Sequence, residues 1–286
     1  MKKIILSFVL LLAVQGVQAQ DCSTLKCPAP YDLTSGFSRG ISTVTGQKFL
    51  SEKIGEKLVK KAIKKNITSG DIKVNLDAYS VRDLKAGRFK SLEINGKNVD
   101  IQGVYISSFN AKTLCNFNYI ANDKRGNYIV KEDIPASFNA IITEEDLNKT
   151  MLSSDYKRMI DDINSIGGNL NIFQITSTNI KLKNDKMYYV LKYSMPFVRK
   201  TKELVITANL KVENGQIELA NTSFLNNSMA LDVDKLSKLI NYINPLDFSA
   251  KILENKDAKF NIETVNISNG KITIDGNMTI LKDKEQ

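Results

Sequence analysis

The chain of 286 residues is 42% hydrophobic and carries 40 Lys and Arg against 31 Asp and Glu, a formal net charge of +9. This composition can bury a sizeable core, which excludes a disordered chain, and the lack of histidine excludes Ser-His-Asp and Cys-His catalytic sets. With few arginines and no compact basic-aromatic motif, the sequence gives no reason to expect nucleic acid as a partner.

Residues 1–19 have the features of a secretory signal peptide. Lys2 and Lys3 precede an apolar run, and the small residues Val17 and Ala19 precede a cleavage point before Gln20. We therefore expect export to the periplasm or the extracellular space, with an uncleaved membrane anchor as the alternative. A basic exported protein can favour anionic lipid, although the lysines can equally well serve only to solvate the surface.

Residues 20–40 contain prolines and glycines without hydrophobic periodicity, which predicts an extended leader that lies on the domain or hangs from it. In an oxidising compartment a Cys22–Cys27 disulfide could close a small loop near the N-terminus. Cys115 would then be a buried free thiol. Three cysteines without histidine make a poor metal site, so we expect neither a metal nor a cofactor.

The first helix is expected at roughly residues 43–65. On a helical wheel its apolar side chains cover about 220°, and a group of lysines covers about 60°. Because a surface helix usually needs a narrower apolar stripe, this helix is predicted to be enclosed on more than one side. The apolar positions are Leu50, Ile54, Leu58, Val59, Ala62 and Ile63, and the lysines are Lys53, Lys57, Lys60 and Lys64.

After this helix the hydrophobic period changes from 3.6 to 2, which predicts a meander of antiparallel strands. A second helix should begin at the N-cap Thr143 and end at Gly167–Gly168, and a meander follows again. A third helix, residues 232–244, and a final hairpin complete the pattern. Asn-Gly pairs at residues 95–96, 214–215 and 269–270 predict hairpin turns.

The predicted fold class is therefore α+β, with residues 41–286 forming one domain of two helix-plus-meander halves. The acidic clusters at residues 144–146 and 161–162 are explained as a helix start and a solvated helix surface. We assign no catalytic residue and expect that the protein is not an enzyme.

Three segments in order carry a resemblance to a known family. They are "AGRFKSLEINGKNVDIQGVYISSFNAKTL", "ITEEDLNKTM" and "INPLDFSAKILE" followed by "NIETVNISNGKITIDGNMTI". The chain resembles the LmeA-like phospholipid-binding family over roughly Phe49–Leu281. The resemblance implies an exported phospholipid-binding protein with a tubular lipid-binding (TULIP-like) architecture. In such a fold a long curved antiparallel sheet wraps an N-terminal amphipathic helix, beside two further helices, and leaves an apolar groove.

The hypothesis is that phospholipid or another acyl lipid binds between helix and sheet, in a protein that carries or transfers lipid. Leu50, Ile54, Leu58 and Ile63 are the candidates for the apolar wall. Lys53, Lys57, Lys60 and Lys64 are the candidates for headgroup binding or for peripheral contact with an anionic membrane. The same side chains can instead be plain core and solvated surface, in a structural or partner-binding envelope module with a filled core.

Overall fold

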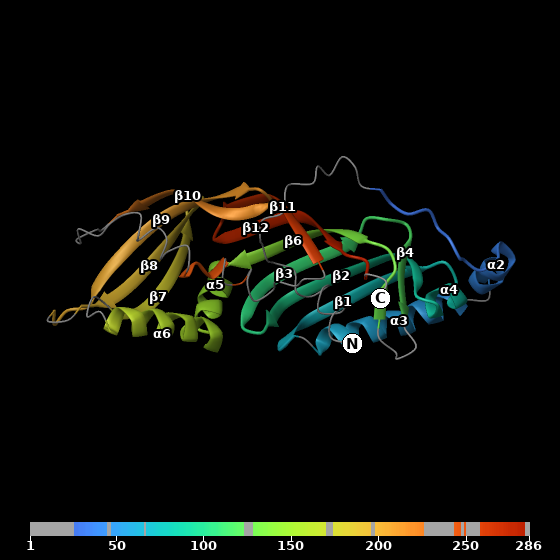
Figure 1. Ribbon diagram of the computed structural model, residues 1–286, viewed down its shortest axis with the longest axis horizontal. Coiled ribbons are helices and arrows are strands. Elements are labelled where there is room, and N and C mark those ends of the chain that lie inside the picture. Colours follow the sequence, from blue (N-terminus) through green and yellow to red (C-terminus); the bar gives the residue numbers. More distant parts are fainter. Residues whose placement is uncertain are drawn as a thin grey trace.

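The protein is described by a computed structural model that covers residues 26–44, 47–65, 67–122, 128–169, 174–195, 198–225, 243–246, 249 and 258–283. The predicted signal peptide, Cys22 and nearly all of the predicted third helix lie outside these ranges. The described strands are antiparallel and form two sheets beside a few helices, which confirms the predicted α+β class. Figure 1 shows an elongated molecule with one sheet toward each end.

The first sheet has eight strands in the order β11-β12-β6-β3-β2-β4-β5, and β1 also pairs with β2. Its strands are β1 (Ser69–Ala78), β2 (Arg88–Ile101), β3 (Val104–Thr113), β4 (Asn118–Asn122), β5 (Tyr128–Val130), β6 (Ile134–Thr143), β11 (Ala258–Ser268) and β12 (Lys271–Ile280). The second sheet has the order β10-β9-β8-β7. Its strands are β7 (Gln174–Lys183), β8 (Lys186–Ser194), β9 (Lys202–Glu213) and β10 (Gln216–Phe224). The end of the chain thus returns to the first sheet, where β12 pairs with β6.

Five helices accompany the sheets in the described part of the chain. They are α2 (Gly36–Val44), α3 (Gln47–Lys64), α4 (Val81–Lys85), α5 (Glu144–Met151) and α6 (Ser154–Asn169). Thr143 is the N-cap of α5, as predicted, and forms a capping box with Asp146. The predicted second helix is divided into α5 and α6, and α6 continues through the two glycines that we expected to end it.

The polar face of the first sheet carries a row of three asparagines and one aspartate, Asn95, Asn110, Asn139 and Asp275, at paired positions on four strands. Asn110 donates a hydrogen bond to Asn95 at 2.8 Å, and Asn139 donates one to Asp275 at 2.7 Å. Residues that flank this row on the same strands point to the other face and are buried, as the two-residue period of a strand requires. The sheet therefore has one solvated face and one apolar face.

The Asn95–Gly96 hairpin prediction was wrong, because both residues lie in the middle of β2. The chain turns instead at Gln102 and Gly103, whose φ angles are 53° and 86°. Gly96 serves a different purpose, since a Cβ there would lie 2.0 Å from the ring of Phe109 on the neighbouring strand. Glycine therefore makes room for that ring on the apolar face. The other two Asn-Gly pairs do form the predicted turns, between β9 and β10 and between β11 and β12.

The disulfide prediction was also wrong, because Cys27 pairs with Cys115 and not with Cys22. This bridge attaches the leader to the loop between β3 and β4, and Cys115 is buried but not free. Further contacts fix the leader on the domain. Tyr31 donates a hydrogen bond to Glu132 at 2.8 Å, and Asp32 forms an ion pair with Arg88. Residues 26–35 thus form a leader that lies on the domain, whereas residues 36–40 belong to α2 and are not extended as predicted.

Thr34 of the leader binds the fully buried carboxylate of Asp83 on α4. The carboxylate accepts hydrogen bonds from the backbone and the hydroxyl of Thr34, both at 2.8 Å, and from Ser80 at 2.6 Å. Burial alone would raise the pKa of Asp83, but these hydrogen bonds outweigh it and hold the pKa below its usual value. The carboxylate therefore stays ionised at neutral pH and orders the residues around it.

In both halves a helix lies along an edge strand and its side chains bind the free peptide groups of that strand. Glu52 and Glu56 of α3 accept from the N–H groups of Ala78 and Leu76 on β1, at 2.8 and 3.3 Å. Four residues of helix rise by about 6 Å and two residues of strand by about 6.7 Å, so the two spacings match. Figure 1 shows α3 along β1 and α6 along β7 on the same long side of the molecule.

Asparagines perform the same task at the edge of β7. Asn148 of α5 accepts from the N–H of Ile180 and donates to its carbonyl, both at 2.9 Å. Asn164 of α6 binds the N–H and the carbonyl of Ile175 at 2.6 and 2.9 Å. An open edge that would otherwise recruit another strand is thereby closed.

Replacing Asn148 by Ala is expected to lower the free energy of unfolding by about 1–3 kcal/mol, since two partly buried peptide groups of Ile180 lose their partner. Asn148→Asp, which keeps the acceptor and loses the donor, should fall between Ala and the wild type. Urea unfolding followed by circular dichroism measures both. Lys183 is an exposed residue of β7, the strand that contains Ile180, and Lys183→Ala is the matched control. An Asn148→Ala midpoint equal to that of the control would contradict the role of this side chain.

Candidate functional site

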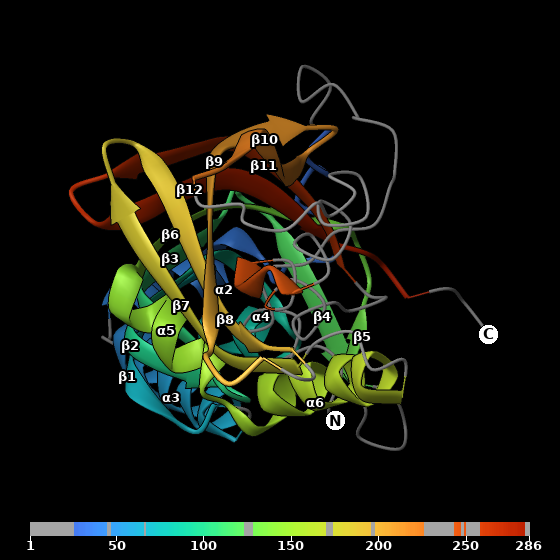
Figure 2. The ribbon, with the colours of Figure 1, turned by 90° about the vertical axis from the view of Figure 1, so that its left-hand side faces the viewer.

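The apolar faces of both sheets contribute to one connected interior. Alternate residues of each strand point into it, and their side chains are at most 8% exposed. The first sheet contributes, among others, Ile72, Ile94, Phe109, Phe138, Ile272 and Ile274, and the second contributes Ile180, Leu182, Met187, Leu191, Leu204 and Ile206. Figure 2 shows the strands of both sheets curving over α3, α5 and α6.

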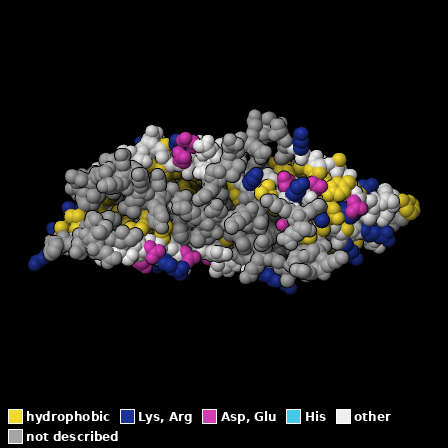
Figure 3. All heavy atoms as spheres, in the orientation of Figure 1, with side chains coloured by type: hydrophobic (Ala, Val, Ile, Leu, Met, Phe, Trp, Pro, Cys, Tyr) yellow, Lys and Arg dark blue, Asp and Glu magenta, His cyan; other side chains and the backbone are white. Residues whose placement is uncertain are grey.

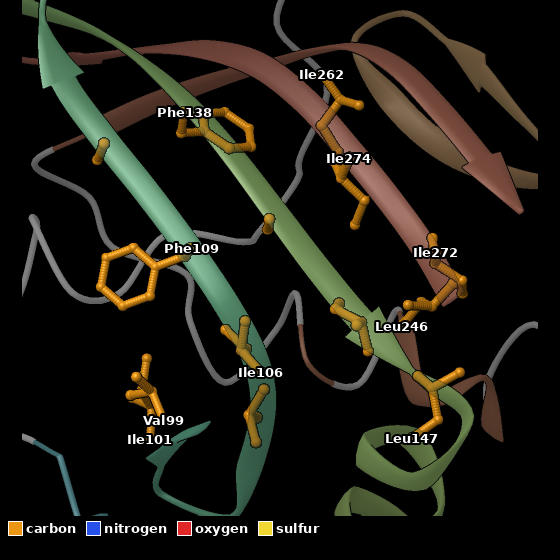
Figure 4. Close-up of a cluster of buried hydrophobic side chains, with 14 of the residues drawn as sticks. Val99, Ile101, Ile106, Phe109, Phe138, Leu147, Leu246, Ile262, Ile272 and Ile274 are labelled. Carbon is orange, nitrogen blue, oxygen red and sulfur yellow. The ribbon is translucent and has the colours of Figure 1, made fainter. Parts of the chain in front are cut away.

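A short segment around Ile243 lies inside the interior. Ile243 and Leu246 are 0% and 7% exposed, and both belong to the cluster formed by the sheets. Figure 4 shows Leu246 among the same buried side chains as Ile272 of β12 and Leu147 of α5. The interior is therefore filled with protein at this point.

Two buried tyrosines hold that segment. The hydroxyl of Tyr156 on α6 donates to the carbonyl of Ile243 at 2.6 Å and is 2.9 Å from the hydroxyl of Tyr189 on β8. Burial raises the pKa of Tyr156 to about 12 and that of Tyr189 well above its ordinary value. Both hydroxyls thus remain neutral and act through hydrogen bonds, which connect the helix, the sheet and the inner segment.

Of the four residues predicted to form an apolar wall between helix and sheet, only Ile63 lies there. Its side chain is 0% exposed and packs in the interior cluster. Leu50, Ile54 and Leu58 are 63%, 61% and 63% exposed, so their predicted placement toward the sheet was wrong.

The cause is that α3 lies along the edge of the sheet and is not wrapped by it. Its inward face consists of Glu52, Gly55, Glu56, Val59 and Ile63, with the two carboxylates on β1. A Cβ at Gly55 would lie 2.6 Å from the side chain of Leu76, so glycine allows the helix to approach β1 closely. In the sequence, this inward face was marked by Gly55 lying between Glu52 and Glu56, two glutamates four residues apart.

The predicted lysines lie on the outer side of α3. Lys53, Lys57 and Lys64 are exposed and Lys60 is half-buried. Lys53 forms an ion pair with Glu56 at 2.7 Å and lies 5.6 Å from the centre of the Phe49 ring. The role of the four lysines in headgroup binding or membrane contact stays a prediction, and none of them lies in the buried interior.

The described residues of the interior cluster offer apolar contact. The part of the chain that the structure describes holds no group of three or more acidic or cysteine side chains that could bind a metal ion. Within the same ranges, no helix combines the length and the apolar character needed to cross a membrane. Sequence reasoning missed the Tyr156–Tyr189 pair, because a tyrosine in an apolar stripe gives no sign of its partner.

Comparison with known proteins gives one match. The model of a family described as LmeA-like phospholipid-binding matches residues 46–277, from the start of α3 to β12. This range includes both sheets except the last three residues of β12, and nearly all of the connected interior. No match was found to a curated protein or to a solved structure.

Proposed function

Because the chain belongs to the LmeA-like phospholipid-binding family, we propose that it is an exported lipid carrier whose apolar interior holds the acyl chains of a phospholipid. The observation that carries the proposal is the connected apolar cluster, which extends over the inner faces of both sheets. The family is a lipid-binding family and not an enzyme family, which agrees with a passive role.

Exclusion of hydrocarbon from water would supply the affinity. At about 25 cal/mol per Å², a few hundred Å² of buried acyl surface contributes several kcal/mol before the cost of association. The interior offers Ile, Leu, Val, Met and Phe side chains for this contact, and Ile63 extends it to the first helix. Acyl chains need no polar partner, so recognition of the tails requires shape and apolar surface only.

Lysines would contribute by attracting anionic headgroups. Lys57 and Lys64 are exposed on α3, and each lysine near an anionic surface contributes about 1 kcal/mol. Figure 3 shows hydrophobic side chains with both basic and acidic residues among them toward the end of the molecule that carries α2 and α4. The exposed lysines of α3 are the groups that support an encounter with anionic phospholipid.

The test is to purify the protein from cells that export it and to identify co-purified lipid by native mass spectrometry and lipid extraction. We expect bound phospholipid and transfer of labelled phospholipid between donor and acceptor vesicles. Ala140→Phe adds a large side chain on the apolar face, next to Phe109 and Ile274, and should lower the lipid content. Ile141→Phe, on the opposite face of the same strand, is the matched control.

A second function is favoured by one observation, the placement of Ile243 and Leu246 inside the interior. A partner-binding envelope module would have a core that is filled by its own side chains, such as Ile243 and Leu246, and would need no lipid. Absence of both co-purified lipid and vesicle transfer in the wild type would support this module and refute the carrier.

A further inference from the structure

The outer face of α3 carries an apolar row that nothing covers in the described part of the structure. Leu50, Ile54 and Leu58 follow each other at four-residue spacing and are each more than 60% exposed. They form a row of about 12 Å along the helix. Three large aliphatic side chains aligned on one exposed helix face are unlike the scattered apolar residues of an ordinary surface.

The inward face of α3 fixes the direction of this row. Glu52 and Glu56 bind the edge of β1 through their carboxylates, and Ile63 is buried in the interior. Turning the row toward the sheet would break these hydrogen bonds and expose Ile63. The apolar row is therefore held toward the surroundings by the fold itself.

The charges beside the row are all of one sign. Lys57, Lys61 and Lys64 are exposed, and none has an acidic partner within 4.0 Å among the described residues. Both acidic residues of α3 point to β1, so no exposed position of the helix is acidic. The exposed positions of α6 over residues 154–165 differ, since the basic Lys157 and Arg158 are followed there by the acidic Asp161 and Asp162, and none of the exposed side chains in that range is a large apolar one.

We propose that the outer face of α3 is a docking surface for an anionic lipid bilayer. Leu50, Ile54 and Leu58 would enter the boundary between headgroups and acyl chains while the lysines lie at the level of the phosphates, as in helices that lie in a membrane interface. The charge selects this occupant, because a second copy of the chain would place lysines against lysines. The inference rests on the proposed function only for the reason why docking is useful, since a carrier must reach a membrane to load and unload lipid.

Vesicle flotation with the full chain tests the proposal. Wild-type protein should float with vesicles of phosphatidylcholine containing about a third phosphatidylglycerol, and much less with phosphatidylcholine alone or in high salt. The variant Leu50→Ser/Ile54→Ser/Leu58→Ser should lose about tenfold or more of its partitioning. Lys57→Gln/Lys61→Gln/Lys64→Gln should lose the preference for phosphatidylglycerol. The double variant Leu152→Ser/Leu225→Ser, at two other exposed leucines, is the matched control and should float like the wild type.

The readouts separate this inference from the carrier function. The serine variant should keep the co-purified lipid of the wild type, since its three side chains lie outside the interior. Undiminished flotation of the serine variant would overturn docking and leave the carrier intact. A wild-type dimer that becomes a monomer in the serine variant would also overturn it, by identifying a second copy as the occupant. Flotation of a wild-type protein that shows neither co-purified lipid nor vesicle transfer would support docking and refute the carrier.

Discussion

Removal of the Cys27–Cys115 disulfide is expected to lower the free energy of unfolding by about 4–5 kcal/mol. The bridge joins residues 88 positions apart, and the loop-closure entropy that it removes from the unfolded chain grows with loop length. The double variant Cys27→Ala/Cys115→Ala should show this loss in urea unfolding followed by circular dichroism. Wild-type protein treated with a reductant should unfold at a similarly lowered urea concentration.

Cys22→Ala is the natural control, because it removes the third cysteine of the chain and leaves the bridge in place. Its unfolding midpoint should equal that of the wild type. Peptide mapping without reduction should recover Cys27 linked to Cys115. A double variant as stable as the wild type would show that this bridge does not stabilise the fold, and an equal loss in Cys22→Ala would show that the loss is not specific to this bridge.

The disulfide also shows where sequence reasoning lacks information. Cys22 and Cys27 are close in the sequence, which made them the natural pair, whereas Cys115 approaches Cys27 only once the leader lies on the sheet. That position depends on Tyr31, Asp32 and Thr34, whose partners are all more than 45 residues away. Such long-range contacts leave no periodic signal in the sequence.

Local signals predicted the elements well. The two-residue period identified the meanders, and Thr143 with the acidic residues after it located the start of α5. The Asn95–Gly96 pair failed because a glycine in a strand can also make room for a neighbouring ring, here that of Phe109. The same dipeptide thus has two structural meanings, and only the neighbouring strand distinguishes them.

The wide apolar arc on the helical wheel of α3 predicted a helix enclosed on more than one side, which was wrong, because the wheel does not show which part of the arc faces the sheet. Leu50, Ile54 and Leu58 suggested the inward face because they are more hydrophobic than the glutamates. The edge of β1 offers free N–H groups, however, and a carboxylate satisfies such a donor where an alkyl side chain cannot. Hydrogen-bonding demand at the strand edge therefore decided the orientation of the helix.

The second large effect on stability is expected at Tyr156, which binds the inner segment through the carbonyl of Ile243. Tyr156→Ala is expected to lower the free energy of unfolding by about 3–5 kcal/mol, because it removes a fully buried ring and leaves a cavity between α6 and β8. Tyr156→Phe keeps the ring and removes only the hydroxyl that binds the Ile243 carbonyl and Tyr189, so about 1–3 kcal/mol is expected. Tyr188→Phe, whose side chain is half-buried on the same strand as Tyr189, is the matched control.

Urea unfolding gives these free energies, and hydrogen exchange tells what the hydroxyl holds. If Tyr156 ties the inner segment to the helix, the amide of Leu246 should exchange faster in Tyr156→Phe while the amides of β12 stay protected. Equal loss of protection at both places would assign the tyrosine to global stability alone. A selective loss would show that the segment in the apolar interior can open separately from the sheets, which is what the entry of an acyl chain into this filled space requires.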